Sequence, residues 1–189
     1  MGLSRSDANP VTDGGPAAPD LDALYRAHAP AVARWASRLA GPDVDVEDLV
    51  HEIFLVAGRR LSEFRGDAKL TTWLYRITER VALDGRRRAR LRRWFSRTRS
   101  LEIERVFSPS QPTPLDALER RQSVEAVYRI LDRMPDKYRT VLILFELEGL
   151  SGEEIAALTG QKEATVWVRL HRARARFLHE MKRALGREP

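Results

Sequence analysis

The chain contains no cysteine among its 189 residues. Disulfide bonds, zinc–thiolate sites and a thiol redox switch within this chain are therefore excluded. It also lacks any apolar run near the ~18 residues that a membrane-spanning helix needs. The N-terminal segment MGLSRSDANPVTDGGPAAPD has no hydrophobic region of the kind found in secretory signals. We therefore expect a soluble, cytoplasmic protein.

Negative charge is missing from one segment and positive charge from another. The formal net charge is +6 and the isoelectric point is about 10.1, which favours an anionic partner, either nucleic acid or a membrane surface. Eight arginines and no acidic residue lie between Gly85 and Leu101, whereas five acidic residues and no lysine or arginine lie between Asp43 and Glu52. This segregation points to two different partners.

Alternating strand patterns are also missing, and at least five helical patterns predict an all-α fold. The expected helices begin near residues 20, 45, 70, 119, 135, 151 and 163. The proline-rich stretch SPSQPTP at 108–114 is typical of a linker. We predict a disordered tail followed by two small helical domains on a flexible linker. The ranges are 1–19 for the tail, 20–95 for the first domain, 96–117 for the linker and 118–186 for the second domain.

The second domain has the pattern of a helix-turn-helix. Ser151 and Glu154 form a capping box at the start of a short helix, and Gly160 provides a sharp turn at its end. In the helix that follows, apolar residues recur at helical spacing and predict its buried face. The opposite face carries Thr165, Val168, His171, Arg172 and Arg176, flanked by Trp167 and Arg169.

Such a face can enter the major groove of DNA. Arg172 can then read guanine, and Thr165 or Arg169 can hold a phosphate. The alternative is a plain αα-hairpin whose arginines are merely solvated. Alone, this motif indicates only a DNA-binding regulator.

The helix that begins near Leu70 combines aromatic residues with arginine. Its core sector is Leu70, Leu74, Ile77 and Val81, and an adjoining ridge carries Trp73, Arg76, Arg80 and Arg87. Aromatic rings and guanidinium groups on one ridge suit single-stranded nucleic acid. The preceding loop FRGDAK, residues 64–69, can accept an extruded base because Gly66 lets backbone approach closely. The alternative is that Trp73 and Tyr75 complete the core and that the arginines are solvated.

The helix that begins near Asp45 has an acidic outer face. Asp48, Glu52, Leu55 and Arg59 share that face, and His51 lies beside it. A leucine among carboxylates on an outward face is typical of a protein interface, although a single exposed leucine is also ordinary. No metal-ligand spacing, catalytic pair or phosphate-binding glycine loop is present. We therefore expect no enzyme activity, metal, cofactor or small-molecule substrate.

Three blocks together resemble bacterial sigma factors of the extracytoplasmic-function (ECF) type. They are DLVHEIFLVAGRRLSEFRGDAKLTTWLYRITERVALDGRRR, MPDKYRTVLILFELEGLSGEEIAALTG and ATVWVRLHRAR, in that order. The resemblance implies a promoter-specificity subunit with a region 2 domain and a region 4 domain. The expected partners are core RNA polymerase, promoter DNA and an anti-sigma factor, which is often membrane-bound.

The resemblance also implies roles for individual residues. The β′ clamp helices would bind Asp48, His51, Glu52, Leu55 and Arg59. The −10 element would be bound by Phe64, Asp67, Lys69, Trp73, Arg76, Arg80 and Arg87. The −35 element would be bound by Lys162, Thr165, Trp167, Val168, Arg169, His171, Arg172 and Arg176. The helices before the recognition helix would bind the β flap.

Two departures from the family pattern bear on promoter choice. Many relatives have Asn where this chain has Arg80, and usually a basic residue followed by Ser where it has Trp167 and Val168. The latter pair favours apolar contacts, for example with thymine methyl groups. Two other hypotheses compete with a sigma factor. They are a stand-alone helix-turn-helix regulator and an RNA-binding protein that uses the arginine segment.

Overall fold

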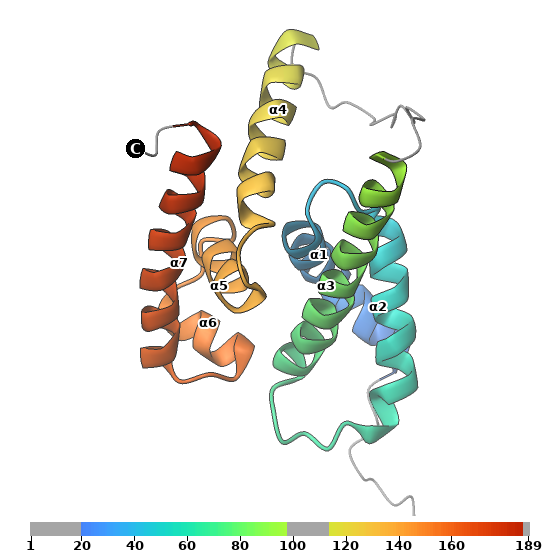
Figure 1. Cartoon of the computed structure of the whole chain (residues 1–189). Helices are drawn as coiled ribbons and strands as arrows, with labels where there is room; N and C mark the ends of the chain where they lie inside the picture. Colours follow the sequence, from blue (N-terminus) through green and yellow to red (C-terminus); the bar gives the residue numbers. More distant parts are fainter. Residues whose placement is uncertain (1–19, 98–113, 187–189) are drawn as a thin grey trace, which may run out of the picture.

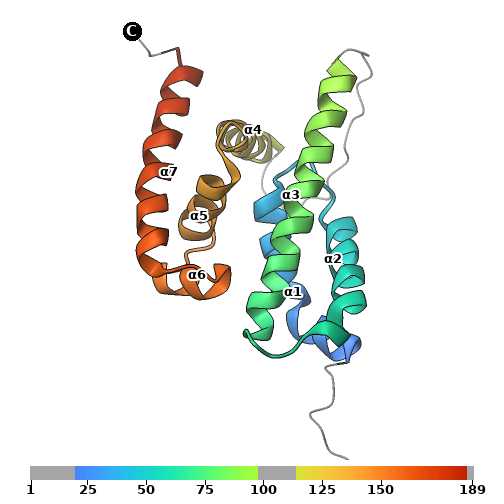
Figure 2. The same cartoon turned by 60° about the horizontal axis from the view of Figure 1, so that its bottom comes forward.

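The computed structural model describes residues 20–97 and 114–186, so the predicted tail and most of the predicted linker lie outside the described residues. The elements are α1 (Leu21–Ala40), α2 (Val46–Arg60), the 3-10 helix η1 (Leu61–Glu63), α3 (Leu70–Arg97), α4 (Pro114–Leu131), α5 (Asp136–Glu146), α6 (Gly152–Thr159) and α7 (Glu163–Ala184). Every regular element in the described ranges is helical, which confirms the all-α class. Two groups of helices, α1–α3 and α4–α7, lie side by side in both views (Figures 1 and 2).

The N-terminal group is held by two capped helices and a shared core. Asp20 and Asp45 accept hydrogen bonds from backbone N–H groups in the first turns of α1 and α2, which fixes where both helices start. Apolar residues of the three helices are then buried against one another. Among the most buried are Leu24, Val32, Leu39, Leu49, Ile53, Ala57, Leu74 and Tyr75.

The C-terminal group contains the predicted helix-turn-helix. Ser151 and Glu154 form both reciprocal hydrogen bonds of a capping box on α6. Gly160 ends α6 with φ at +66°, a left-handed conformation that glycine adopts without strain. The α7 residues Val166, Leu170 and Ala173 are buried, as their spacing predicts.

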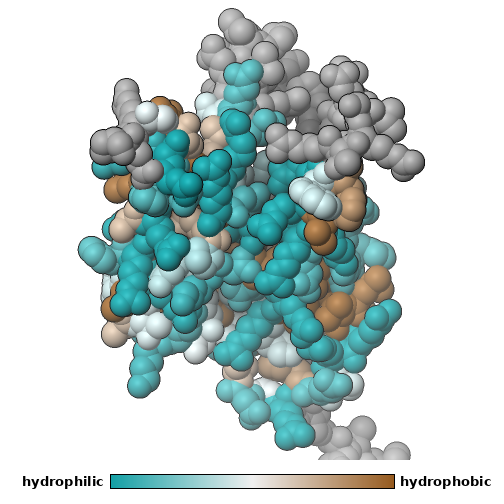
Figure 3. Space-filling view, in the orientation of Figure 1, coloured by the Kyte–Doolittle hydropathy of each residue, from teal (hydrophilic) through white to brown (hydrophobic). Residues whose placement is uncertain are grey.

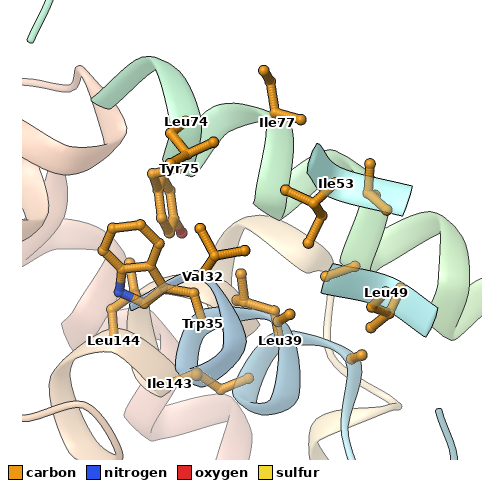
Figure 4. Packing of buried hydrophobic residues seen from close by; sticks show 14 of the residues in the cluster. Val32, Trp35, Leu39, Leu49, Ile53, Leu74, Tyr75, Ile77, Ile143 and Leu144 are labelled. Atoms are coloured by element: carbon orange, nitrogen blue, oxygen red, sulfur yellow. The ribbon is translucent and has the colours of Figure 1, made fainter. Parts of the chain in front are cut away.

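The two groups share one hydrophobic core. Ile143 and Leu144 of α5 lie near Trp35 and Leu39 of α1, and Tyr75 of α3 packs edge-on against Trp35 (Figure 4). At one end of this contact the Tyr128 hydroxyl donates to the carbonyl of Arg38 at 3.0 Å. The two groups therefore touch through apolar as well as polar surface, a packing that the sequence did not indicate.

Several details differ from the sequence-based expectations. α3 continues to Arg97 and α4 begins at Pro114, so helix occupies both ends of the range expected to be linker. Proline is tolerated at the first position of a helix because its missing N–H would have no partner there. On α1, Leu21 and Tyr25 are apolar residues at the helical spacing of a buried face but are exposed, because they lie on the outer side of the α1–α2 contact.

Candidate nucleic-acid interface

The basic face of α7 borders a hollow of about 420 Å³. Thr165, Val168, Arg169 and Arg172 line it from α7, as does Ala164, and Lys137 and Tyr138 line it from α5. The Arg172 guanidinium lowers the pKa of Tyr138 below its ordinary value, and the Arg176 guanidinium lies 5.6 Å from the centre of the same ring. The Tyr138 side chain thus lies beside two arginines of the predicted −35 set.

Lys137 and Tyr138 were not among the predicted site residues. Both residues lie in α5, and α6 separates them from α7 in the sequence. They come beside α7 only because α5 packs on α7. The lone signal available in the sequence was a Lys-Tyr pair at the start of an apolar helix. That pattern is too common to indicate a binding site.

Trp167 has a packing role in addition to its exposed surface. Its Nε1 donates to a Glu163 carboxylate oxygen at 3.0 Å, and its ring meets Phe145 edge-on with centroids 5.8 Å apart. A Cβ atom at Gly152 would come within 2.6 Å of the indole. The side chain therefore fastens α7 to α5 and α6, while 46% of the residue stays exposed.

The remaining α7 candidates differ in exposure. Val168, His171, Arg172 and Arg176 are exposed, whereas Thr165 and Arg169 are half-buried. Lys162 is the N-cap of α7 but makes no side-chain capping bond. Arg174, on the same helix, instead pairs with Glu146 at 2.7 Å and lies over the Phe145 ring. The basic residues of α7 therefore divide into a structural side and a side available to a ligand.

The first of the predicted −10 residues, Phe64 and Trp73, form an aromatic pair. Phe64 and Trp73 contact each other with centroids 5.4 Å apart, and both are half-buried beside the core. Asp67 and Lys69 are exposed in the loop between them, where Gly66 has φ at +77°. The sequence-based alternative that Trp73 helps to complete the core thus holds for part of its surface, and it holds fully for Tyr75.

The arginines of the −10 ridge, Arg76, Arg80 and Arg87, are all exposed, but two of them have contacts within the chain. The Arg76 guanidinium lies against Gly160, so closely that a Cβ atom there would collide with it. Arg87 pairs with Asp84 at 3.3 Å and with Asp136 at 2.9 Å. Two of the three ridge arginines therefore contact the C-terminal group.

Most of the described arginines that follow Gly85 are also paired. Arg86, which is buried, contacts Asp132 and Asp136. Further along α3, Arg88 pairs with Glu52 at 2.8 Å, and Arg93 pairs with Asp132 at 3.2 Å. Acidic side chains that are distant in sequence therefore pair with part of the arginine segment of α3.

Most of the residues assigned to the outer face of α2 are exposed in the structure. Asp48, His51, Leu55 and Arg59 are exposed, and Leu55 retains 48% of its accessible surface. Figure 3 shows apolar residues along the edge of the molecule formed by α2. Beside them, a hollow of about 700 Å³ between α1 and α2 is lined by apolar side chains that include Leu21, Tyr25, Val50, Phe54 and Leu55.

A second apolar hollow, of about 410 Å³, lies between α4, α5 and α7. Its apolar lining is Val127, Leu131, Leu142, Ile143, Leu147, Phe177 and Leu178. Apolar grooves between helices suit an amphipathic helix of a partner. Within residues 20–97 and 114–186, no cluster of three or more His, Asp or Glu could hold a metal ion. In the same ranges no helix is long and apolar enough to cross a bilayer.

Comparison with known families assigns both groups of helices. The family described as Sigma-70 region 2 matches residues 24–92, and the family described as Sigma-70, region 4 matches residues 124–177. The ECF RNA polymerase sigma factor SigE of Mycolicibacterium smegmatis is 36% identical over 159 residues, which are 84% of this chain and 60% of that protein. The ECF RNA polymerase sigma-E factor of Escherichia coli K12 is 37% identical over 149 residues, 76% of each chain.

Other relatives extend the similarity to structure. The probable RNA polymerase sigma factor RfaY of Xanthomonas campestris is 33% identical over 71% of this chain, which spans only 34% of that protein. CnrH, solved in complex with the cytosolic domain of CnrY, matches with a TM-score of 0.54, 25% identity, and coverage of 84% of this chain and 85% of that one. The sigma factor RpoE of Bartonella quintana, solved with the anti-sigma factor NepR, has the same fold, with a TM-score of 0.53 at 24% identity over 86% of this chain and 97% of that one.

Proposed function

The chain belongs to the extracytoplasmic-function family of RNA polymerase sigma factors, and from this membership we propose that it is a promoter-specificity subunit. It binds core RNA polymerase and directs initiation at promoters with −10 and −35 elements. It acts in the cytoplasm and catalyses no reaction itself. The observation that carries the proposal is the occurrence of regions 2 and 4, in order, on two helical groups that each present a candidate contact surface.

In the C-terminal group, α7 is the recognition helix for the −35 element. Its exposed Val168, His171, Arg172 and Arg176 can reach base edges and phosphates, and Thr165, Arg169 and Lys162 lie at its start or flank. The position of Arg172 and Arg176 beside Tyr138 supports this assignment, because it gathers two guanidinium groups on the face of α7 that would meet DNA. Trp167 contributes its exposed half at the edge of the same face.

In the N-terminal group, the loop 64–69 and the start of α3 bind the −10 element. Phe64 and Trp73 offer aromatic surface for an unpaired base, and Asp67 and Lys69 are exposed beside them. The ridge arginines Arg76, Arg80 and Arg87 hold the strand. Arg76 and Arg87 are exposed and also contact the C-terminal group, so a strand that binds them competes with those contacts.

The protein partners have their own surfaces. The β′ clamp helices of the polymerase bind the α2 face of Asp48, His51, Glu52, Leu55 and Arg59. The β flap binds the apolar hollow between α4, α5 and α7. An anti-sigma factor controls the protein, as the complex of the Bartonella relative suggests by analogy, and can hold it at the membrane.

The test is run-off transcription with core polymerase and a library of genomic promoter fragments. The protein should direct initiation from one class of promoter, and a Leu55→Ala/Asp48→Arg variant should lose both core binding and transcription while its helical content is unchanged. The exposure of both residues supports that design, since neither substitution disturbs the core. Sequence-specific DNA binding without any polymerase requirement would instead indicate a stand-alone regulator.

A further inference from the structure

Two exposed apolar side chains follow each other near the start of the proposed recognition helix. Trp167 retains 46% of its accessible surface and Val168 retains 50%. One turn further along α7, on the same two faces, lie the exposed side chains of His171 and Arg172. The N-terminal residues of a recognition helix are the ones that meet base edges in the major groove. The apolar pair therefore lies where bases are read.

The indole of Trp167 has no hydrogen bond left to offer a base. Its Nε1, the only polar atom of the ring, donates to a carboxylate oxygen of Glu163 one turn earlier on α7 at 3.0 Å. The edge of the ring that carries Nε1 also faces the start of α6, because Nε1, Cε2 and Cζ2 are the atoms nearest to the Cβ position of Gly152. The surface that the indole offers a ligand is therefore carbon.

Gly152 allows the indole to lie in this position. A Cβ atom there would come within 2.6 Å of Cζ2 and 2.7 Å of Cε2, closer than carbon atoms pack without a bond. The backbone of Gly152 gives no other reason for glycine, because it starts the helix α6 and lies outside the left-handed region that favours glycine. Phe145 of α5 meets the same ring edge-on, with centroids 5.8 Å apart. Residues of α5, α6 and α7 thus fix the indole together.

A carbon surface in the major groove distinguishes one base from the others. Thymine alone presents a methyl group there, at C5, whereas guanine, adenine and cytosine present hydrogen-bond donors and acceptors. An apolar side chain pressed against such a group leaves it without a partner, which costs free energy. Val168 has no polar side-chain atom and the exposed part of Trp167 is carbon, so both side chains favour thymine.

The helix also places the thymine relative to the other bases. Val168 and Arg172 both line the hollow between α5 and α7. They are separated by four residues, which is roughly 6 Å along the helix axis. That distance is the rise of about two base pairs at ~3.4 Å each. A thymine in contact with Val168 thus lies close to the guanine that Arg172 can read.

We propose that Trp167 and Val168 select thymine methyl groups in the −35 element, and that Gly152 is a positioning residue that lets the indole take part. The expected −35 element contains a thymine within about two base pairs of a guanine. This inference rests on the proposed promoter function and names a base that the same face reads.

The test uses the chain assembled with core RNA polymerase and a promoter recovered from the run-off library. Each thymine of its −35 element, on either strand, is replaced in turn by deoxyuridine. This change removes the methyl group and leaves the hydrogen-bonding atoms of the base in place. Uracil at two positions, one for each side chain, should weaken promoter binding about fourfold, the contribution of one buried methyl group. Uracil at the remaining thymines should leave binding unchanged.

Two variants assign the methyl groups to side chains. In Val168→Ser, thymine and uracil should bind equally at one of the two positions. Val124→Ser is the matched control, because it replaces a valine of α4 that is 47% exposed, and it should keep the full preference. Gly152→Ala should abolish the preference at the other position only, because the new Cβ atom displaces the indole. In a Trp167→Arg background, Gly152→Ala should not change that ratio further, which separates positioning from a general disturbance of α6.

A −35 element without thymine on either strand, or one in which no uracil weakens binding, would overturn the proposal. A uracil effect that persists in both Val168→Ser and Gly152→Ala would also overturn it, because another residue would then read the methyl groups. A single sensitive position that Val168→Ser abolishes would overturn the roles of Trp167 and Gly152. Run-off transcription separates this result from the proposed function. Failure to transcribe from any fragment rejects the sigma factor, whereas transcription without a uracil effect rejects only the thymine contacts.

Discussion

The arginines of α3 and those of α7 look alike in sequence and behave differently in the structure. Along α3, Arg86, Arg87 and Arg93 are joined to Asp132 and Asp136 across the contact between the two groups of helices. On α7, Arg172 and Arg176 lie against an uncharged ring, that of Tyr138, and both are exposed. Arginine density therefore indicates an anionic partner in both places, but along α3 the chain's own carboxylates supply part of that partner.

The difference shows that the role of a basic segment depends on acids that sequence distance conceals. Asp132 and Asp136 follow the arginine segment by about forty residues and lie beyond the predicted linker. A carboxylate at that separation can be solvated, capping a helix or paired, and composition does not distinguish these states. The same applies to Glu52, which was assigned to the polymerase face and also pairs with Arg88.

The largest effect that separates the two regions should come from replacing one arginine in each. Arg86→Ala leaves Asp132 and Asp136 without the buried guanidinium that contacts both of them, and breaking such a pair should lower the free energy of unfolding by about 3 kcal/mol. Arg172→Ala should change it little, because Arg172 is exposed. Urea denaturation of both variants measures the contrast, and equal stabilities would contradict it.

A second, intermediate effect concerns promoter choice. Arg172→Ala should cost about 1–3 kcal/mol of discrimination at one −35 base pair, because Arg172 is exposed on the recognition face and a guanidinium there can read a base edge. The measurement is transcription with polymerase on a panel of single-base −35 variants. Arg174→Ala is the control, because it also removes one arginine from α7 but that arginine is paired with Glu146. A uniform loss over the whole panel would make Arg172 a phosphate contact instead.

Local signals predicted the elements well and the contacts between them poorly. The capping box of Ser151 and Glu154, the left-handed Gly160 and the buried stripe of α7 are all properties of a few neighbouring residues, and the structure has each of them. In contrast, Arg139 is buried because α1 packs on α5, and the Trp167 indole is partly buried because α6 packs on α7. These contacts exist only in the folded chain. Resemblance to a family supplied roles for residues, but it did not indicate that Arg76 and Gly160 would touch.

The smallest expected effect concerns Glu79, the acid that lies near one arginine from each region. Burial raises the pKa of this carboxyl above its ordinary value of 4.5, against the opposing influence of Thr140, Arg169 and Arg76. A group with a raised pKa in the folded state favours folding below its unfolded pKa, and that contribution is lost as the pH rises through the folded pKa. The free energy of unfolding of Glu79→Gln relative to the unsubstituted protein should therefore increase as the pH rises from about 4 toward neutrality. The increase should be smaller than the energies expected for Arg86→Ala and for Arg172→Ala. Urea denaturation at both pH values checks the sign. A difference that does not change with pH would mean that Arg76 and Arg169 compensate the burial in full, and that α3 and α7 share this carboxylate as an ion pair.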